Sequence, residues 1–229
     1  MRVAIVSGQY PPQKYSEITR IITRDYARQH GYDFYYFQKP VPVENGAGPW
    51  SIYYTKIAYL LEVMKSNAHD LVVWFDADVL ICETDRPLER VADLRDSSID
   101  LHICKDPPQW KYPICSGIFM MLNTPAMQNV MELTYQARHS PRFQQWPPEQ
   151  AALHHYMNTG IVSKIYESRR FNSHPESNYQ EGDFLMHMAG MTGEARYQCI
   201  LRRFNCILTA SNRVPSLSGD CSPQIEVSA

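Results

Sequence analysis

Two aspartates, Asp76 and Asp78, end the unbroken apolar segment that runs from Leu71 to Phe75. An apolar run without alternation predicts a strand buried on both faces, as in a parallel sheet covered by helices. Ligands of such sheets bind beyond the carboxyl ends of the strands. Two carboxylates there can both approach one Mg²⁺ or Mn²⁺, which completes its shell with phosphate oxygens and water. The spacing therefore predicts a cation site for a nucleotide or phosphate. The alternative is that one aspartate caps a turn and the other is solvated.

A histidine late in the chain, His187, is the second candidate ligand. It interrupts the apolar segment from Phe184 to Met188, just before the glycine turn at Gly190. Such a histidine is more often a hydrogen-bonded core residue than a ligand. At a site shared with the two aspartates, however, its imidazole would favour Mn²⁺ over Mg²⁺. The turn at 190–193 opens a predicted helix whose first amides suit a phosphate.

Alternating strands and helices are predicted to position these residues in the first half of the chain. Strands are expected at 2–7, 32–37 and 71–75, and helices at 18–30 and 57–64. Gly31 follows the first helix as a glycine suited to a left-handed cap. Residues 40–49, rich in Pro and Gly, are expected to form a loop. The order β-α-β-α-β predicts a parallel sheet with nucleotide-binding topology.

The second half of the chain is more mixed. Its strand candidates are 99–104, 114–122, 162–166 and 184–188, and its helix candidates are 126–137, 149–157 and 197–208. We therefore expect one α/β domain over residues 1–209. Residues 210–229, rich in Ser, Pro and Asn, are expected to form a tail or a linker to further C-terminal domains.

The composition excludes several classes of partner. The 229 residues carry Lys+Arg 22 against Asp+Glu 24, a net charge of -2, so neither nucleic acid nor an anionic membrane is expected as the main partner. The apolar stretch at 1–7 is too short for a signal peptide, and no segment is long enough for a membrane helix. The six cysteines form no C-x-x-C pair, and three lie in apolar segments, which indicates reduced thiols and a cytoplasmic protein.

A buried strand ending in D-x-D, with the distal segment D-F-x-x-H-x-A-G at 183–190, resembles the GT-A class of nucleotide-sugar glycosyltransferases. Four further segments are similar to the family of fungal galactosyl- and mannosyltransferases and plant xyloglucan xylosyltransferases: 26–34, 54–57, 116–123 and Glu149-Gln150. The resemblance runs in order from about Val3 to Arg196. The chain is also similar to the N-terminal glycosyltransferase modules with which chlorella viruses glycosylate the capsid, and such a module would act in the host cell.

This resemblance implies a fold and an activity. The fold would be a single GT-A domain, Rossmann-like, with a mostly parallel central sheet flanked by helices. The activity would be metal-dependent transfer of a sugar from a UDP-sugar, or another NDP-sugar, to a hydroxyl of a glycan or glycoprotein. The cofactor would be Mn²⁺ or Mg²⁺, which would neutralise the departing diphosphate.

The resemblance also implies roles for individual residues. Asp78 and His187 would ligate the metal, and Asp76 would bond the donor ribose or a metal-bound water. Further donor contacts are expected from residues around the first strand, the D-x-D motif and the distal glycine turn, namely Ser7, Gly8, Tyr10, Lys14, Lys56, Ala77, Gly117, Gly190 and Arg196. Tyr10 would stack on the base. Lys14, Lys56 and Arg196 would approach the diphosphate, although each basic residue taken alone is more often a solvated surface charge.

Glu149 and Gln150 are the catalytic candidates. Glu149 either deprotonates the acceptor hydroxyl, which implies inversion at the anomeric carbon, or is an acid favoured at a helix N-terminus. Gln150 would matter in a retaining mechanism, in which its amide faces the donor sugar. The chain departs from its relatives here, since they often have Asp-Gln. They also often place a Lys after the final His-x-x-Gly, where Arg196 is the first base in this chain.

Other functions compete with sugar transfer. In a D-x-D phosphohydrolase Asp76 would be the nucleophile and Asp78 the acid-base group, but that class expects the motif near the N-terminus and paired acids later in the chain. A non-catalytic nucleotide- or glycan-binding module is the other alternative. Aromatic residues in or beside predicted loops suit sugar faces, although packing is the more usual role of such side chains: Trp50, Tyr53, Trp110, Tyr112 and Trp146.

Overall fold

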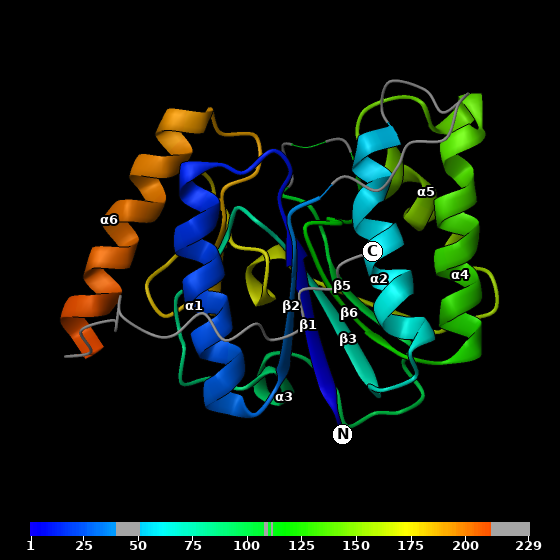
Figure 1. Ribbon diagram of the computed structural model, residues 1–229, viewed down its shortest axis with the longest axis horizontal. Coiled ribbons are helices and arrows are strands. Elements are labelled where there is room, and N and C mark those ends of the chain that lie inside the picture. Colours follow the sequence, from blue (N-terminus) through cyan, green and yellow to red (C-terminus); the bar gives the residue numbers. More distant parts are fainter. Residues whose placement is uncertain (40–50, 108–109, 111, 212–229) are drawn as a thin grey trace.

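A six-stranded sheet in the order β2-β1-β3-β6-β5-β7 forms the centre of the protein (Figure 1). The computed structural model describes residues 1–39, 51–107, 110 and 112–211. The strands are β1 (Val3–Gly8), β2 (Asp33–Phe37), β3 (Leu71–Asp76), β5 (Leu101–Cys104), β6 (Ile118–Leu122) and β7 (Ser163–Tyr166). β1 is parallel to β2 and β3, and β5 is parallel to β7, whereas β6 is antiparallel to both β3 and β5. The predicted mostly parallel α/β sheet is therefore confirmed.

Helices cover both faces of this sheet. On one face lie α1 (Lys14–His30), α6 (Gly193–Ser211) and the short α3 (Leu88–Val91) (Figure 1). On the other lie α2 (Thr55–Lys65), α4 (Pro125–Gln136) and α5 (Pro148–Tyr156). Four 3-10 turns complete the elements: η1 (Ser51–Tyr54), η2 (Ala137–His139), η3 (Pro141–Phe143) and η4 (Ser168–Arg170).

The unbroken apolar run of β3 follows from this layering. Leu71, Val73 and Phe75 pack into the core beneath α1 and α6. Val72 and Trp74 pack into the separate core beneath α2, α4 and α5. A strand buried on both faces needs apolar side chains at successive positions, because alternate side chains point to opposite faces.

Most predicted elements have the observed bounds to within a few residues. Gly31 ends α1 in the left-handed conformation (φ 71), and its N–H donates to carbonyls of the last helical turn. One expected strand, 114–122, starts only at Ile118, because residues 116–117 form a turn before β6. The predicted loop at 40–49 lies outside the described residues. The last helix runs to Ser211, so most of the predicted tail also lies outside them.

A second, two-stranded sheet was not predicted. β4 (Val79–Ile81) starts three residues after β3 ends and pairs antiparallel with β8 (Leu185–His187). Val79 is the register partner of His187. The small sheet therefore joins the D-x-D turn to a segment more than a hundred residues later.

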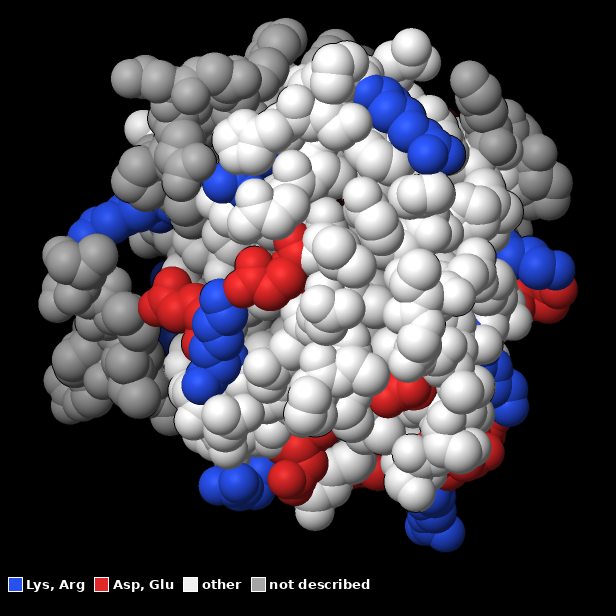
Figure 2. Space-filling model, turned by 90° about the vertical axis from the view of Figure 1, so that its right-hand side faces the viewer, with Lys and Arg blue, Asp and Glu red and all other residues white. Residues whose placement is uncertain are grey.

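The structure also describes most of the cysteines and part of the charged surface. Of the cysteines in the described residues none forms a disulfide, and Cys82, Cys104 and Cys115 are buried. No helix in the described part of the chain is long and apolar enough to cross a membrane. Figure 2 shows the side of the molecule on which α2, α4 and α5 lie. Charged residues of both signs are scattered over it without a continuous basic stripe among the described residues.

Candidate active site

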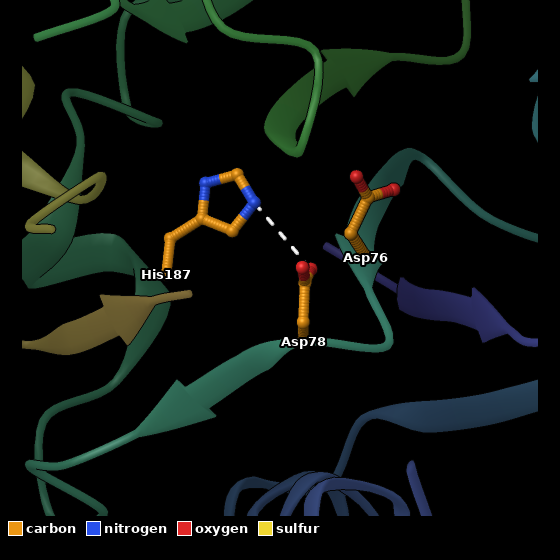
Figure 3. A group of neighbouring side chains, drawn as sticks. All are labelled: Asp76, Asp78 and His187. Carbon is orange, nitrogen blue, oxygen red and sulfur yellow. Dashed lines mark ion pairs between the residues drawn. The ribbon is translucent and has the colours of Figure 1, made fainter. Parts of the chain in front are cut away.

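Asp76, Asp78 and His187 converge at the carboxyl end of β3 (Figure 3). Asp76 is the last residue of β3, and Asp78 lies in the turn that leads into β4. The pairing of β4 with β8 places His187 opposite Val79, and the N–H of Met188 donates to the carbonyl of Asp78 (3.1 Å). One ligand atom from each of the three side chains lies within 4.8 Å of the others. The structure thus brings together the three predicted metal ligands.

The imidazole of His187 is oriented by Asn172. Its Nδ1 lies 2.8 Å from Oδ1 of Asn172, a carbonyl oxygen that can only accept a hydrogen bond. Nδ1 therefore carries the proton, which leaves the lone pair of Nε2 facing Asp78, 3.5 Å from Oδ1. Metal-binding histidines are commonly held in this way, with the second ring nitrogen donating to an oxygen acceptor. The donor set, two carboxylates and one oriented imidazole, fits Mn²⁺ and also Mg²⁺.

Gly117 gives this imidazole its space. A Cβ atom at Gly117 would lie 2.2 Å from Cε1 of His187, which is closer than real Cβ contacts. The carbonyl of Gly117 also accepts from the N–H of Asp76 (2.8 Å), so the same glycine adjoins two of the candidate ligands. The glycine that was predicted to bind the donor therefore shapes the cluster of candidate metal ligands.

Arg196 ties the segment after β8 to Asp78. Its guanidinium lies 3.4 Å from Oδ2 of Asp78 and donates to the carbonyls of Met188 (3.1 Å) and Met191 (3.0 Å) and to the Tyr15 hydroxyl (2.9 Å). Burial would raise the pKa of Asp78. The hydrogen bond and charge that His187 supplies when Nε2 also carries a proton, together with the charges of Arg196 and Lys56, outweigh burial and lower that pKa below its ordinary value. Asp78 is thus held as a carboxylate, the form that binds a cation.

Lys56 bridges the D-x-D motif and the catalytic candidates. Its Nζ lies 2.9 Å from Oδ1 of Asp76 and 3.1 Å from Oε1 of Glu149, and it donates to the carbonyl of Ser116 (3.3 Å). Burial alone would lower the pKa of Lys56, but the charges of Asp76 and Glu149 raise it well above its usual range. The indole N–H of Trp74 donates to the same oxygen of Asp76. Asp76 is therefore held by two donors before any ligand binds.

Glu149 and Gln150 belong to one buried network. Gln150 accepts from the N–H of Ser116 (2.8 Å) and donates to Oδ2 of Asp106 (2.9 Å), and the Ser116 hydroxyl lies 3.1 Å from Oε1 of Glu149. Burial raises the pKa of Asp106. Oε2 of Glu149 and Oδ1 of Asp106 are buried and have no hydrogen-bond partner among the described residues. Unpartnered buried oxygens are costly, so both atoms are candidates to accept hydrogen bonds from a ligand.

A cavity of about 1160 Å³ opens over these residues. Most of the predicted site residues line it: Gly8, Tyr10, Lys56, Asp76, Ala77, Asp78, Gly117, Glu149, Gln150, His187, Gly190 and Arg196. Ser7 and Lys14 do not. Ser7 is buried within β1, and Lys14 is exposed at the start of α1. Gly8 is required by packing, because a Cβ there would lie 2.6 Å from the carbonyl oxygen of Phe37.

Two site residues were missed from the sequence. Asp106 follows β5 by two residues, and β5 runs parallel to β3, so its carboxyl end lies at the same edge of the sheet. An acid just after a second buried strand was the signal that could have identified it. Asn172 follows the short turn η4 in an irregular segment, and nothing in its sequence surroundings points to His187.

The fold is shared with solved glycosyltransferase structures. A glycosyltransferase involved in the glycosylation of the major capsid of PBCV-1 matches with a TM-score of 0.79 and 20% identity over 88% of this chain and 100% of that chain. GlyE of Streptococcus pneumoniae TIGR4 matches with TM-scores of 0.54 and, in its apo form, 0.55, at 11% identity. These matches cover 95% of this chain but 66% and 65% of the GlyE chains. No family model and no curated protein matches. At such identities the likeness establishes the fold and confirms the predicted GT-A-like α/β domain.

Proposed function

We propose that the protein is a glycosyltransferase that moves a sugar from a nucleotide diphosphate, with UDP-sugars the expected donors, to a hydroxyl of a glycan or glycoprotein. One observation supports this most strongly. Asp76, Asp78 and the Asn172-oriented His187 form a three-ligand cluster at the carboxyl end of β3. Because a fold by itself does not determine an activity, the proposal rests on this cluster and its cavity within a fold shared with glycosyltransferases.

Asp78 and His187 would hold Mn²⁺ or Mg²⁺, with Asp76 as a direct ligand or a contact to the ribose. When bound, the ion supplies positive charge to the departing diphosphate. Arg196 and Lys56 line the same cavity, and both are already ion-paired to the D-x-D carboxylates. Their positive charges would also stabilise the negative charge of the departing diphosphate. Gly8, Tyr10, Ala77, Gly117 and Gly190 are proposed donor contacts on the same cavity wall.

Glu149 is the proposed catalytic residue. It is 4% exposed, lines the cavity, and has one carboxylate oxygen, Oε2, that no described residue satisfies. Gln150 lies beside it with its carbonyl and amide already bonded to Ser116 and Asp106. We therefore propose that Glu149 removes the proton of the acceptor hydroxyl and that Gln150 positions the turn before β6. A general base at this position implies inversion at the anomeric carbon. A product that retains the anomeric configuration of the donor would exclude Glu149 as the base.

The phosphohydrolase alternative fits the site less well. A nucleophilic Asp76 would attack phosphorus with a carboxylate that is already engaged, since Lys56 contacts both of its oxygens and Trp74 donates to Oδ1. A non-catalytic module would instead bind the nucleotide without transferring a sugar to any acceptor.

A donor screen tests the proposal. Nucleotide sugars with and without Mn²⁺ are compared by thermal shift, and product anomers are then analysed for the best donor. Ligand at roughly a hundred times its Kd contributes about 2.7 kcal/mol of stability, an easily measured rise in Tm. We expect the rise to require Mn²⁺ and to be lost in Asp78→Ala but kept in Glu62→Gln, which changes an exposed acid on α2. Unchanged metal-dependent donor binding in Asp78→Ala would rule out the metal assignment. Full transfer by Glu149→Gln would exclude Glu149 as the base.

A further inference from the structure

Exposed aromatic side chains gather at the mouth of the cavity. Large hydrophobic residues that are strongly exposed are few among the described residues, and three of them line this cavity: Tyr10 (47%), Ile52 (44%) and Trp146 (58%). Tyr53 lines it as well. Clustered exposed apolar side chains indicate a binding surface, whereas single ones need no explanation.

Tyr53 and Trp146 form a paired wall next to the proposed base. Their rings pack edge to face, with centroids 4.7 Å apart and planes at 77°. Tyr53 lies three residues before Lys56, and Trp146 lies three residues before Glu149. The same two chain segments therefore meet twice, once through the aromatic pair and once through the ion pair of Lys56 and Glu149 (3.1 Å). The charge of Glu149 helps burial to raise the pKa of Tyr53, which agrees with this proximity.

The wall is fixed in place by its backbone. Trp146 directly precedes Pro147 and Pro148, where α5 begins, and its carbonyl accepts from the hydroxyl of Tyr112 (2.7 Å). Tyr53 belongs to the 3-10 turn η1, which leads into α2. A rigid aromatic surface loses little conformational freedom when a ligand binds.

The position of the wall separates it from the proposed nucleotide site. Gly8 ends β1 and Tyr10 follows it, whereas Glu149 contacts Ser116 just before β6. The strand β3, which carries Asp76, lies between β1 and β6. A nucleotide bound between β1 and the proposed metal ligands would leave the aromatic wall free to bind the acceptor. The ring of a pyranose has an apolar C–H face that packs on an indole and a rim of hydroxyls. A ring packed on this wall would point one hydroxyl toward Oε2 of Glu149.

We propose that Tyr53 and Trp146 form the acceptor subsite and bind a pyranose ring of the acceptor glycan by stacking. This inference rests on the proposed function and names the class of acceptor, a glycan whose terminal sugar presents an apolar face, rather than an unglycosylated peptide. The reacting hydroxyl would belong to the stacked ring, because the two segments that carry the aromatic pair also bring Glu149 against Lys56 in the same cavity.

Binding and kinetics together test the subsite. Methyl glycosides of common hexoses and pentoses are added to the protein with Mg²⁺ and UDP and followed by saturation-transfer NMR. The best binder is then used as the acceptor in the transfer assay. We expect the acceptor Kd and KM to rise roughly tenfold in Trp146→Ala, as for a central aromatic contact, and to stay near wild type in Trp146→Phe. Val162→Ala is the matched control, since Val162 is 54% exposed but lies outside the cavity lining.

The outcomes separate the subsite from the proposed function. An unchanged acceptor Kd in Trp146→Ala, or no glycoside bound by the wild type, overturns the subsite even where donor binding is intact. If Trp146→Ala lost UDP affinity to the same extent, the subsite would also be overturned, because the uracil ring of the nucleotide would then be what packs on the wall. A wild type that binds no nucleotide with metal refutes the proposed function itself.

Discussion

At the scale of single residues, the site is defined by what each polar atom has already bonded. Nδ1 of His187 is satisfied by Asn172, and both side-chain groups of Gln150 are satisfied by neighbours. Nε2 of His187, Oε2 of Glu149 and Oδ1 of Asp106 belong to residues that line the cavity, and none of these three atoms has a close hydrogen bond of its own among the described residues. The chemistry of the site is therefore concentrated on a few atoms.

Replacing Asn172 tests whether its hydrogen bond to His187 prepares the imidazole for metal binding. In Asn172→Ala the imidazole loses the acceptor that fixes its tautomer, so the affinity for Mn²⁺ in the presence of UDP is expected to fall by about 10- to 100-fold. The measurement is isothermal calorimetry, with Asn178→Ala as the control, since Asn178 bonds Ser168 and His174 instead. Wild-type Mn²⁺ affinity in Asn172→Ala would contradict the tautomer argument.

His102, away from the site, makes the stability of the fold pH-dependent. It is fully buried in β5, and burial lowers its pKa from 6.5 to about 4. Between these values the unfolded chain binds a proton that the folded chain does not, so stability is present at neutral pH and declines as the pH falls through this window. The loss amounts to at most about 3 kcal/mol.

The contribution of His102 is measurable by urea unfolding at several pH values between 7.5 and 4. In His102→Gln the free energy of unfolding should depend less on pH across this window than in the wild type. His155→Gln, at an exposed position, should leave the wild-type slope. Identical slopes in the wild type and His102→Gln would show that folding leaves the pKa of His102 unchanged, contrary to this argument.

At the scale of elements, the turn before β6 is a spacer between the proposed metal ligands and the proposed catalytic residues. Gly117 contacts His187, and Ser116 contacts Glu149 and Gln150. This turn lies within the range 114–122 that the sequence predicted as strand, because its residues are apolar or small. Propensity could not reveal that the first residues stay out of the sheet in order to hold side chains from two later segments.

Adding one methyl group tests this spacer. Gly117→Ala places a Cβ within 2.2 Å of the imidazole of His187, so the ring or β8 must shift. We expect loss of Mn²⁺ binding together with a destabilisation of about 1–3 kcal/mol. Gly193→Ala is the control, because a Cβ there meets nothing within 4 Å. Calorimetry and urea unfolding on both variants check the expectation, and metal binding retained by Gly117→Ala would refute it.

At the scale of the whole molecule, the cluster of Asp76, Asp78 and His187 joins two parts of the chain that the sequence could describe only separately. The order of strands and helices up to β3 followed from apolar periodicity, and so did the D-x-D motif at the sheet edge. No sequence pattern indicates β4, a three-residue strand directly after the motif, because so short a segment has no period of its own. The convergence of Asp78 and His187 depends on that strand.

Ligand binding should therefore stiffen distant segments together. With Mn²⁺ and UDP we expect slower amide exchange in both strands of the small sheet and in the first turn of α6, where Arg196 contacts Asp78. Amides of α4, on the opposite face of the sheet, should be unaffected. Hydrogen–deuterium exchange by mass spectrometry provides the comparison, with Asp78→Ala as the variant that should show no protection. Protection confined to 76–78 would mean that the two parts are not coupled.

The pairing of β4 with β8 also determines which changes of chain length the site can tolerate. Val79 faces His187 because the register of the small sheet is fixed. A slip of one residue would turn the imidazole to the opposite face and present a methionine in its place, since side chains alternate along a strand. A single-residue insertion or deletion within β8 would thus remove a metal ligand without altering any of the proposed site residues. The number of residues in β8 is therefore as tightly constrained as their identity.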